Sequence, residues 1–491
     1  MGTKEYYLQK AEELLSPLIR TKTYADRKEA ILERGETLVL DFGNHFVGYF
    51  SFRMWWFDQY LDAPVRLAVR FCETERELSD DYTQYRGGLC SSWLPEEILN
   101  LDFPGDYSMP RRYAARYVKI FVIDAPHLKI RFSDFCFTAE TSADEERLLS
   151  VRIRDPMIQR IDEVSVRTLK SCMQRVFEDG PKRDRRLWIG DLRLQALVNY
   201  YTFQNFDLVK RCLYLFAAAD CNGHGFLPGY IYENPVFVSG YWYIKDYSLM
   251  YVCSLCDYYD HTGDADTVLD IYPVAQSVME AMNETLDRHG ILTDIGADFF
   301  VDWSVDLKRR IAAHGIYLYT LNKWCRLLGC LGKNDVQAVF GDRLKTGKDA
   351  AIRQFYNQGK NRFEERDGDG QHSVHATVWM VLGGVIEGKL AGDALLRELN
   401  DTESIQPVTP YMHHYTVEAL ITAGLRREAE EYLRKIWGGM VLLGADTFWE
   451  AYVPQNPEFS PYGDRMVNSS CHAWSCTPAY WIRAHSLGIK K

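Results

Sequence analysis

The spacing of the apolar residues changes near residue 146, and this change divides the chain into a β-rich part and a helical part. Before it, Leu128, Ile130 and Phe132 alternate with charged residues, which is the period-two pattern of a half-buried strand. Further β-rich runs occupy residues 38–42, 48–54, 65–71 and 117–123. With the turn residues between them, these runs predict an antiparallel β-sandwich domain over residues 1–145, which begins with a short helix at 7–18.

From residue 146 onward the apolar residues recur three or four positions apart, which predicts helices. Asp155 and Pro156 have the residue types of an N-cap and a first helical position, and one apolar face follows them. Comparable patterns cover residues 191–203, 205–219, 241–262, 265–287, 308–330, 334–357, 371–389, 411–424, 427–440 and 471–487. Such a region is a solenoid or a closed toroid of helical hairpins. Because no repeat of a known solenoid period is present, we predict an (α/α)6 six-hairpin toroid over residues 146–491.

Charge and hydropathy exclude several classes of partner. The 57 Lys plus Arg residues stand against 68 Asp plus Glu, and the formal net charge of −11 argues against a nucleic acid or an anionic membrane as partner. The first residues are charged throughout, and no window approaches roughly 18 uncharged apolar residues. We therefore expect a cytoplasmic protein without membrane contact, and the sequence leaves open whether it forms a homo-oligomer.

The residues that could carry chemistry are carboxylates beside aromatic rings. The chain has no glycine-rich nucleotide-binding motif after a strand and no Gly-x-Ser-x-Gly elbow. Aromatic residues make up 14% of it, more than a core of this size needs. Aromatic faces cover the apolar faces of sugars while carboxylates bind their hydroxyls. This composition favours a small carbohydrate as partner, and we expect no cofactor and no metal.

The densest cluster of charge lies between two predicted helices. It contains Asp179, Arg183, Asp184, Trp188 and Asp191, and residues 179–191 hold three Asp and three Arg in all. From composition alone, this segment is either a functional loop held down by Trp188 or a surface loop of Arg–Asp salt bridges.

A second cluster surrounds Glu450, which has Trp449 before it and Tyr452 after it. A glutamate in an aromatic wall is either a general base or a capped residue of the core, and the residues alone do not choose between them. The same pairing of a ring with a hydrogen-bonding group recurs at Trp242 with Asp246, at Asp302 with Trp303, and at His472 with Trp474.

Taken together, these motifs resemble the inverting α-L-rhamnosidase family of six-hairpin glycosidases. The segment Asp179-Gly-Pro-Lys-Arg183-Asp184-Arg-Arg-Leu-Trp188-Ile-Gly-Asp191 is similar to the family's acidic motif, with the same span between its outer aspartates. Thr447-Phe-Trp-Glu450 looks like the family's Thr-x-Trp-Glu, and Ser470-Cys-His472-Ala-Trp474 follows it in the expected order. The resemblance covers most of the chain, although Gly180 stands where the family usually has Cys.

The resemblance implies a role for each of these residues. Asp184 falls on the general acid and Glu450 on the general base of a single-step inverting hydrolase of terminal α-L-rhamnosyl or similar deoxy-sugar groups. The implied substrate-binding residues are Asp179, Arg183, Trp188, Asp191, Trp242, Asp246, Asp302, Trp303, Trp449 and His472. Three alternatives remain open: a hydrolase or lyase of another uronic or deoxy sugar on the same fold, a non-catalytic sugar-binding relative, and a helical scaffold for protein partners.

Overall fold

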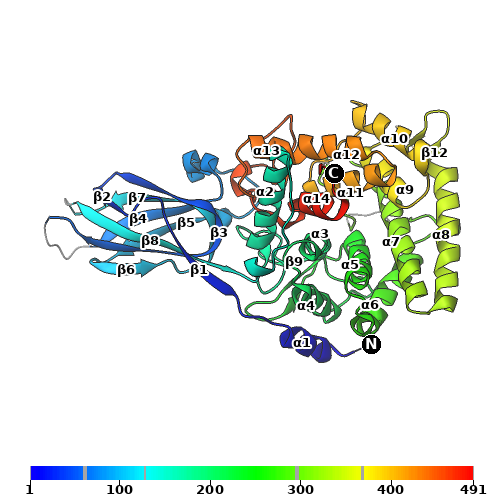
Figure 1. The fold of residues 1–491 in the computed structure, drawn as a ribbon, viewed down its shortest axis with the longest axis horizontal. Helices are drawn as coiled ribbons and strands as arrows, with labels where there is room; N and C mark the ends of the chain where they lie inside the picture. Colours follow the sequence, from blue (N-terminus) through cyan, green and yellow to red (C-terminus); the bar gives the residue numbers. More distant parts are fainter. Residues whose placement is uncertain (1, 59–63, 127–128, 294–297, 366–369, 490–491) are drawn as a thin grey trace.

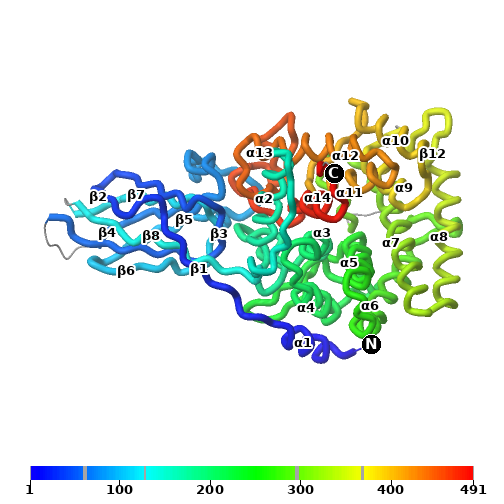
Figure 2. Tube along the Cα trace, viewed as in Figure 1, coloured from blue at the N-terminus to red at the C-terminus, as the bar shows by residue number. Residues whose placement is uncertain are grey.

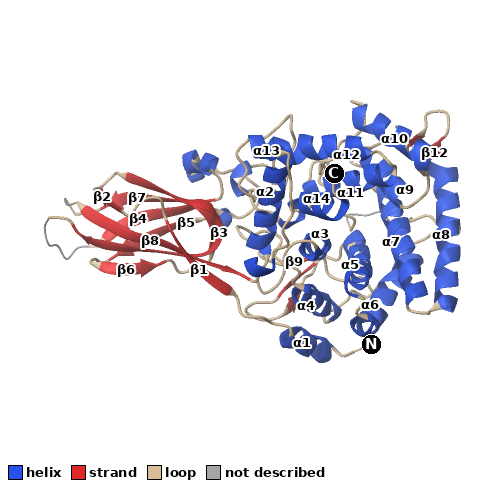
Figure 3. Cartoon of the chain, viewed as in Figure 1, coloured by secondary structure: helices blue, strands red, loops and turns tan. Residues whose placement is uncertain are grey.

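The computed structural model describes residues 2–58, 64–126, 129–293, 298–365 and 370–489, in which a β-domain is joined to a helical domain (Figure 1). The strands of the β-domain are β1 (Ile19–Tyr24), β2 (Glu29–Leu32), β3 (Thr37–Trp56), β4 (Val65–Cys72), β5 (Glu96–Leu101), β6 (Gly105–Ser108), β7 (Tyr113–Asp124) and β8 (Ile130–Thr141). They pair antiparallel in the order β1-β8-β3-β7-β4-β5, with β2 on β8 and β6 on β3. Figure 3 shows this strand-rich domain on one side of the helices, which confirms the predicted fold class.

The long strand β3 determines the shape of the β-domain. Its first half pairs with β7 and its second half with β8, so two strands predicted separately from the sequence are one. Leu40 from the first half and Phe52 from the second lie in the same apolar core, so the sheet folds around a single interior. The register shifts between Asp41 and Phe46. Such a bulge re-aims side chains, and here His45 lies within hydrogen-bond distance of Ser171 in the helical domain.

The helical domain is a ring of inner helices surrounded by outer ones. Its helices are α2 (Pro156–Cys172), α3 (Ile189–Tyr200), α4 (Phe206–Ala217), α5 (Lys245–Thr262), α6 (Ala265–Glu284), α7 (Arg310–Cys330), α8 (Asn334–Phe355), α9 (Val374–Leu382), α10 (Gly388–Asn400), α11 (Pro410–Thr422), α12 (Arg426–Leu433), α13 (Gly439–Leu442) and α14 (Pro478–His485). Helices α3, α5, α7, α9 and α11 pack against one another in turn, and α14 closes the ring against α2 and α3. Every residue of α3 and α9 is buried, as expected for helices that are enclosed on all sides.

Local chemistry explains where several helices begin and end. Asp155 caps α2 by accepting hydrogen bonds from Met157 N and Ile158 N, which confirms the predicted N-cap. The helix predicted at 371–389 ends at Leu382, because Gly384 adopts a φ of +71° that stops the helix. Helix α10 then begins at Gly388, which the sequence analysis did not predict.

The N-terminal helix α1 (Lys4–Glu13) packs on the helical domain although it precedes the β-domain in sequence. It contacts α4, and Tyr7 donates a hydrogen bond to the backbone oxygen of Asp270 in α6. Figure 2 shows the chain running from α1 along the outside of the helices to β1. The division of the chain after residue 145 stays a prediction. None of the helices in the described residues combines the length and apolar content needed to cross a membrane.

Candidate active site

The candidate site lies where the segment 173–188, between α2 and α3, meets the segment 443–477, between α13 and α14. Ala473 N donates to Asp179 O at 2.6 Å, which ties the two segments together. The closed ring therefore brings residues that are far apart in sequence into one place.

Glu450 is held as a carboxylate by several donors. Arg183 Nη2 lies 2.5 Å from both of its oxygens, Tyr462 Oη donates to Oε1 at 2.6 Å, and Ser469 N donates to Oε2 at 3.1 Å. Burial alone would raise the pKa of Glu450, but Arg183, His472 and Tyr462 outweigh it and lower the pKa to about 2. Glu450 is thus ionised at neutral pH.

Asp184 has the opposite protonation tendency. Its side chain is 19% exposed, and burial together with the charge of Glu450 raises its pKa despite the opposing effect of Arg183 and Arg186. Within the described residues its carboxylate has no hydrogen bond from the protein, so a proton on it is free to be donated outward. Asp184 and Arg185 have φ values of +63° and +55°, a left-handed backbone that costs about 1–3 kcal/mol at each non-glycine residue.

The three neighbouring arginines stand in different relations to Asp184. Arg185 Nε donates to Pro181 O at 2.8 Å, and the Arg186 guanidinium lies 4.5 Å from the ring centre of Tyr232. Arg183 forms an ion pair with Asp184, with its Nη1 3.6 Å from Asp184 Oδ1, and the charges of both Arg183 and Arg186 act to lower the pKa of Asp184.

Arg183 therefore bridges the two carboxylates. One of its terminal nitrogens is 3.6 Å from Asp184 and the other is 2.5 Å from Glu450. Since these nitrogens are roughly 2.3 Å apart in a planar guanidinium, the oxygens of Asp184 and Glu450 are separated by at most about 8.4 Å. The carboxyl groups of inverting glycosidases are roughly 6.5–9.5 Å apart.

Two more aspartates and a histidine lie beside this pair. Asp179 and Asp191 are buried, and burial followed by neighbouring carboxylates raises the pKa of both well above the usual value. Asp191 Oδ1, His472 Nδ1 and Trp188 Nε1 are buried without a hydrogen-bond partner among the described residues, although the first two are 3.4 Å apart. Buried polar atoms in native proteins nearly always have partners, so this group is suited to the hydroxyls of a ligand.

Aromatic rings form a continuous wall around these groups. Trp188 contacts Tyr247 at 6.3 Å between ring centres, Tyr247 contacts Phe300 at 5.6 Å, and Phe300 contacts Trp303 at 5.4 Å. The wall ends at Tyr462, 5.5 Å from Trp303. At the other end Trp242 is 43% exposed and lies 6.1 Å from Trp188, so it forms the rim.

Two predicted substrate ligands hold a loop in place. Asp246 accepts hydrogen bonds from Phe300 N and Val301 N, and burial raises its pKa to about 6. Asp302 is fully buried and bonds the Thr409 hydroxyl, Val408 N and His375. These bonds position Trp303 and its neighbours, and a role of Asp246 and Asp302 as sugar ligands stays a prediction. An isolated Asp–aromatic pair in sequence does not reveal this.

Arg183 and Trp449, which were also predicted to bind substrate, contact other parts of the protein. Arg183 is engaged by Glu450, by Tyr462 and, through Nε, by Val467 O. Trp449 lines a cavity of about 650 Å³ between the β-domain and the segment 443–470, and the lining of this cavity includes neither Asp184 nor Glu450.

Sequence reasoning missed Tyr462 and Ser469, which bond Glu450 directly. They lie between the helices predicted at 427–440 and 471–487, in a stretch without apolar periodicity. In the described residues there is no cluster of three or more His, Cys, Asp or Glu side chains that could hold a metal ion.

Comparison with known proteins gives matches over nearly the whole chain. Residues 14–139 match the N-terminal domain model of glycosyl hydrolase family 78 α-rhamnosidases, and residues 146–485 match the bacterial α-L-rhamnosidase six-hairpin glycosidase domain. No match was found among curated protein sequences. Among solved structures, a rhamnosidase from Klebsiella oxytoca with rhamnose bound is 34% identical, with a TM-score of 0.94 and 99% of each chain covered.

More distant structures share the fold. A family 78 rhamnosidase of Bacillus sp. GL1 is 22% identical with a TM-score of 0.78, and the match covers 92% of this chain and 47% of that one. An α-L-rhamnosidase of Streptomyces avermitilis complexed with L-rhamnose is 17% identical with a TM-score of 0.70, covering 96% and 44%. The chain thus spans about half the length of these two enzymes.

Proposed function

The chain belongs to the family 78 α-L-rhamnosidases, which are glycoside hydrolases, and we propose that it removes terminal α-L-rhamnosyl groups from small glycosides in a single inverting step. The observation that carries the proposal is the pair Asp184 and Glu450, bridged by Arg183 and shifted in opposite directions in pKa. Two carboxyls whose surroundings separate their pKa values are suited to act as an acid and a base.

In the proposed reaction Asp184 is the general acid. Its raised pKa favours the protonated form, which gives its proton to the glycosidic oxygen as the bond to the leaving group breaks. Glu450 is the general base and takes a proton from a water that attacks the anomeric carbon from the opposite face. The upper limit of about 8.4 Å admits both the roughly 6.5–9.5 Å separation of inverting enzymes and the roughly 5–5.5 Å separation of retaining ones, so product stereochemistry decides between them.

The sugar would be held by the groups beside this pair. We assign its hydroxyls to Asp179, Asp191 and His472, because unpartnered buried atoms of Asp191 and His472 lie there. Trp188 and Trp303 would cover its apolar faces, and Trp242 on the rim would contact the leaving group. The rhamnose bound to the Klebsiella oxytoca enzyme supports rhamnose as this sugar.

Product stereochemistry tests the mechanism. An aryl α-L-rhamnoside is incubated with the protein, and the anomer of rhamnose formed first is followed by NMR. We expect the β anomer first. Early appearance of the α anomer would refute inversion.

Assays with other glycosides, together with calorimetry, separate the alternatives. Turnover of another deoxy-sugar or uronic glycoside in preference to the rhamnoside would favour a different specificity, and an unsaturated product would favour a lyase. Binding of rhamnose in calorimetry without turnover of any glycoside in a panel would indicate a non-catalytic relative.

A further inference from the structure

One segment of the β-domain reaches both loops that carry the proposed catalytic groups. It follows β4 and includes Glu73 and Glu77, which are 1% and 5% exposed. These carboxylates belong to the β-domain by sequence, yet each of them also has a partner in the helical domain.

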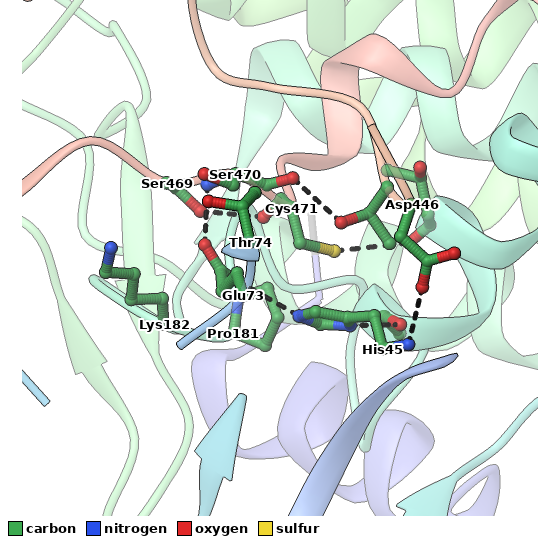
Figure 4. A network of polar contacts seen from close by, with 12 residues as sticks. His45, Glu73, Thr74, Pro181, Lys182, Asp446, Ser469, Ser470 and Cys471 are labelled. Carbon is green, nitrogen blue, oxygen red and sulfur yellow. Dashed lines mark hydrogen bonds and ion pairs between the residues drawn. The ribbon is translucent and has the colours of Figure 1, made fainter. Parts of the chain in front are cut away.

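Glu73 holds the loop that supports Glu450. Its Oε2 accepts a hydrogen bond from Ser470 N at 2.5 Å, as Figure 4 shows from close by. The preceding backbone N–H, that of Ser469, donates to Glu450 Oε2 at 3.1 Å. The consecutive N–H groups of Ser469 and Ser470 are thus bonded to two different carboxylates. By holding Ser470, Glu73 fixes the orientation of the Ser469 N–H toward Glu450.

The other oxygen of Glu73 is paired within the domain interface. Glu73 Oε1 lies 3.1 Å from Nε2 of His45, which the β3 bulge turns toward the helices (Figure 4). Burial would lower the pKa of His45, but nearby Cys471, Glu73 and Asp446 outweigh it and raise the pKa to about 9. Asp446 also accepts a hydrogen bond from His45 N at 2.7 Å. A protonated His45 stabilises the charge on Glu73.

Glu77 holds the other loop. Its Oε2 is 3.1 Å from Nζ of Lys182, and this ammonium also donates to Asn468 O at 3.0 Å. Lys182 is buried and directly precedes Arg183, which binds Glu450. The pair Glu77–Lys182 therefore joins the loop of Arg183 to the loop of Ser469.

We propose that Glu73 and Glu77 are positioning residues for the hydrolytic reaction. Through them the β-domain orders the two loops that carry the proposed catalytic groups. The proposal rests on the role assigned to Glu450 above. Neither residue touches the substrate. They act by fixing the Ser469 N–H and the Arg183 guanidinium against Glu450, and small displacements of such groups reduce rates strongly.

The test compares Glu73→Gln and Glu77→Gln with the control Glu96→Gln. Glu96 pairs with Arg70 inside the β-domain. We expect kcat on an aryl α-L-rhamnoside to fall about 100-fold in the first two variants, with KM little changed. The acidic limb of the pH profile should move to higher pH, because Glu450 loses aligned donors. The Glu96→Gln variant should retain the wild-type rate and profile.

A second readout does not depend on activity. Hydrogen exchange measured by mass spectrometry should accelerate in peptides covering residues 466–474 in Glu73→Gln, and in those covering 179–186 in Glu77→Gln, but not in Glu96→Gln. If one variant fails to fold, the other still tests the proposal, because the two act on different loops.

The outcomes separate the two proposals. Wild-type kinetics and exchange in the folded variants would overturn the positioning role, as would a loss of stability with an unchanged pH profile. If wild-type protein hydrolyses no glycoside, the proposed function fails, and the exchange data alone decide whether the two carboxylates order the loops.

Discussion

The Arg183 guanidinium and the Glu450 carboxylate form a buried ion pair in which Nη2 lies 2.5 Å from both acceptor oxygens. The same guanidinium is 3.6 Å from Asp184. One positive charge thus acts on both carboxyls of the proposed reaction. It stabilises the ionised form of Glu450 more than that of Asp184, because Glu450 is closer.

Replacing Arg183 by Gln should move the whole pH profile of kcat/KM to higher pH. The base works above its pKa and the acid works below its pKa, and loss of the positive charge raises both values. Wild-type enzyme should retain its acidic limb to low pH, since the pKa of Glu450 is about 2. The profile is measured with an aryl α-L-rhamnoside.

The control for this experiment is Arg427→Gln, which removes an arginine whose side chain is 80% exposed. It should leave the profile unchanged. A profile of Arg183→Gln in which only the rate falls, with both limbs in place, would contradict the electrostatic role of Arg183.

Replacing Glu450 by Gln should lower kcat by about 10²–10⁴-fold, the usual contribution of a general base. Rhamnose binding in calorimetry should persist, because Asp179, Asp191 and His472 remain. If the Glu450→Gln variant keeps a kcat within about tenfold of wild type, Glu450 is not the general base.

Replacing Asp184 by Asn should affect poor leaving groups far more than good ones. A proton from the acid is essential for an alkoxide leaving group and almost dispensable for a dinitrophenolate. The ratio of kcat/KM for a dinitrophenyl rhamnoside to that for a rhamnosyl disaccharide should therefore rise by orders of magnitude. Equal losses on both substrates would show that Asp184 is not the acid.

Replacing Asp302 by Ala should destabilise the fold by about 3–5 kcal/mol, because its buried partners His375 and Thr409 lose a carboxylate. Burial opposes ionisation of Asp302, but His375 and Thr409 lower its pKa overall. Its contribution is therefore present above the ordinary carboxyl pKa of about 3.9 and is lost as the pH falls through the lowered value.

Thermal unfolding at neutral and acidic pH measures this effect. Asp393→Ala, which breaks an exposed pair with Lys389, is the control and should change stability by at most about 1 kcal/mol. If Asp302→Ala unfolds like wild type but no longer binds rhamnose, Asp302 is a sugar ligand after all.

Much of the fold follows from apolar periodicity, because inner and outer helices both bury a face of regular spacing. Helix α10 escaped prediction because it begins at Gly388, and its N-cap Glu387 makes no side-chain capping bond. The strand β3 was divided in two because Gly43, with a φ of +78°, resembles a turn in sequence although the strand continues through it.

The proximity of Asp184 and Glu450 was predictable, because each lies in a motif whose order in the chain resembles that of the family, and their catalytic roles stay a prediction. The candidate site was not predictable where a side chain's partner lies in another part of the fold. Asp246 and Asp302 carry the sequence signature of a sugar ligand, and no local pattern indicates their bonds to Val301 N and Thr409. Tyr462 lies in a connection without periodicity, so no local pattern marked it.

The closure of the helical ring by α14 also has a consequence for synthesis of the protein. Arg183 and Glu450 are 267 positions apart in the sequence, and the ring closes through α14 packed on α2. During translation, Arg183 and the adjacent Asp184 emerge long before Glu450. Contacts of such long sequence separation form late in folding. An unfinished chain therefore holds Asp184 without its counterpart, and hydrolytic activity reports that the last helix has docked.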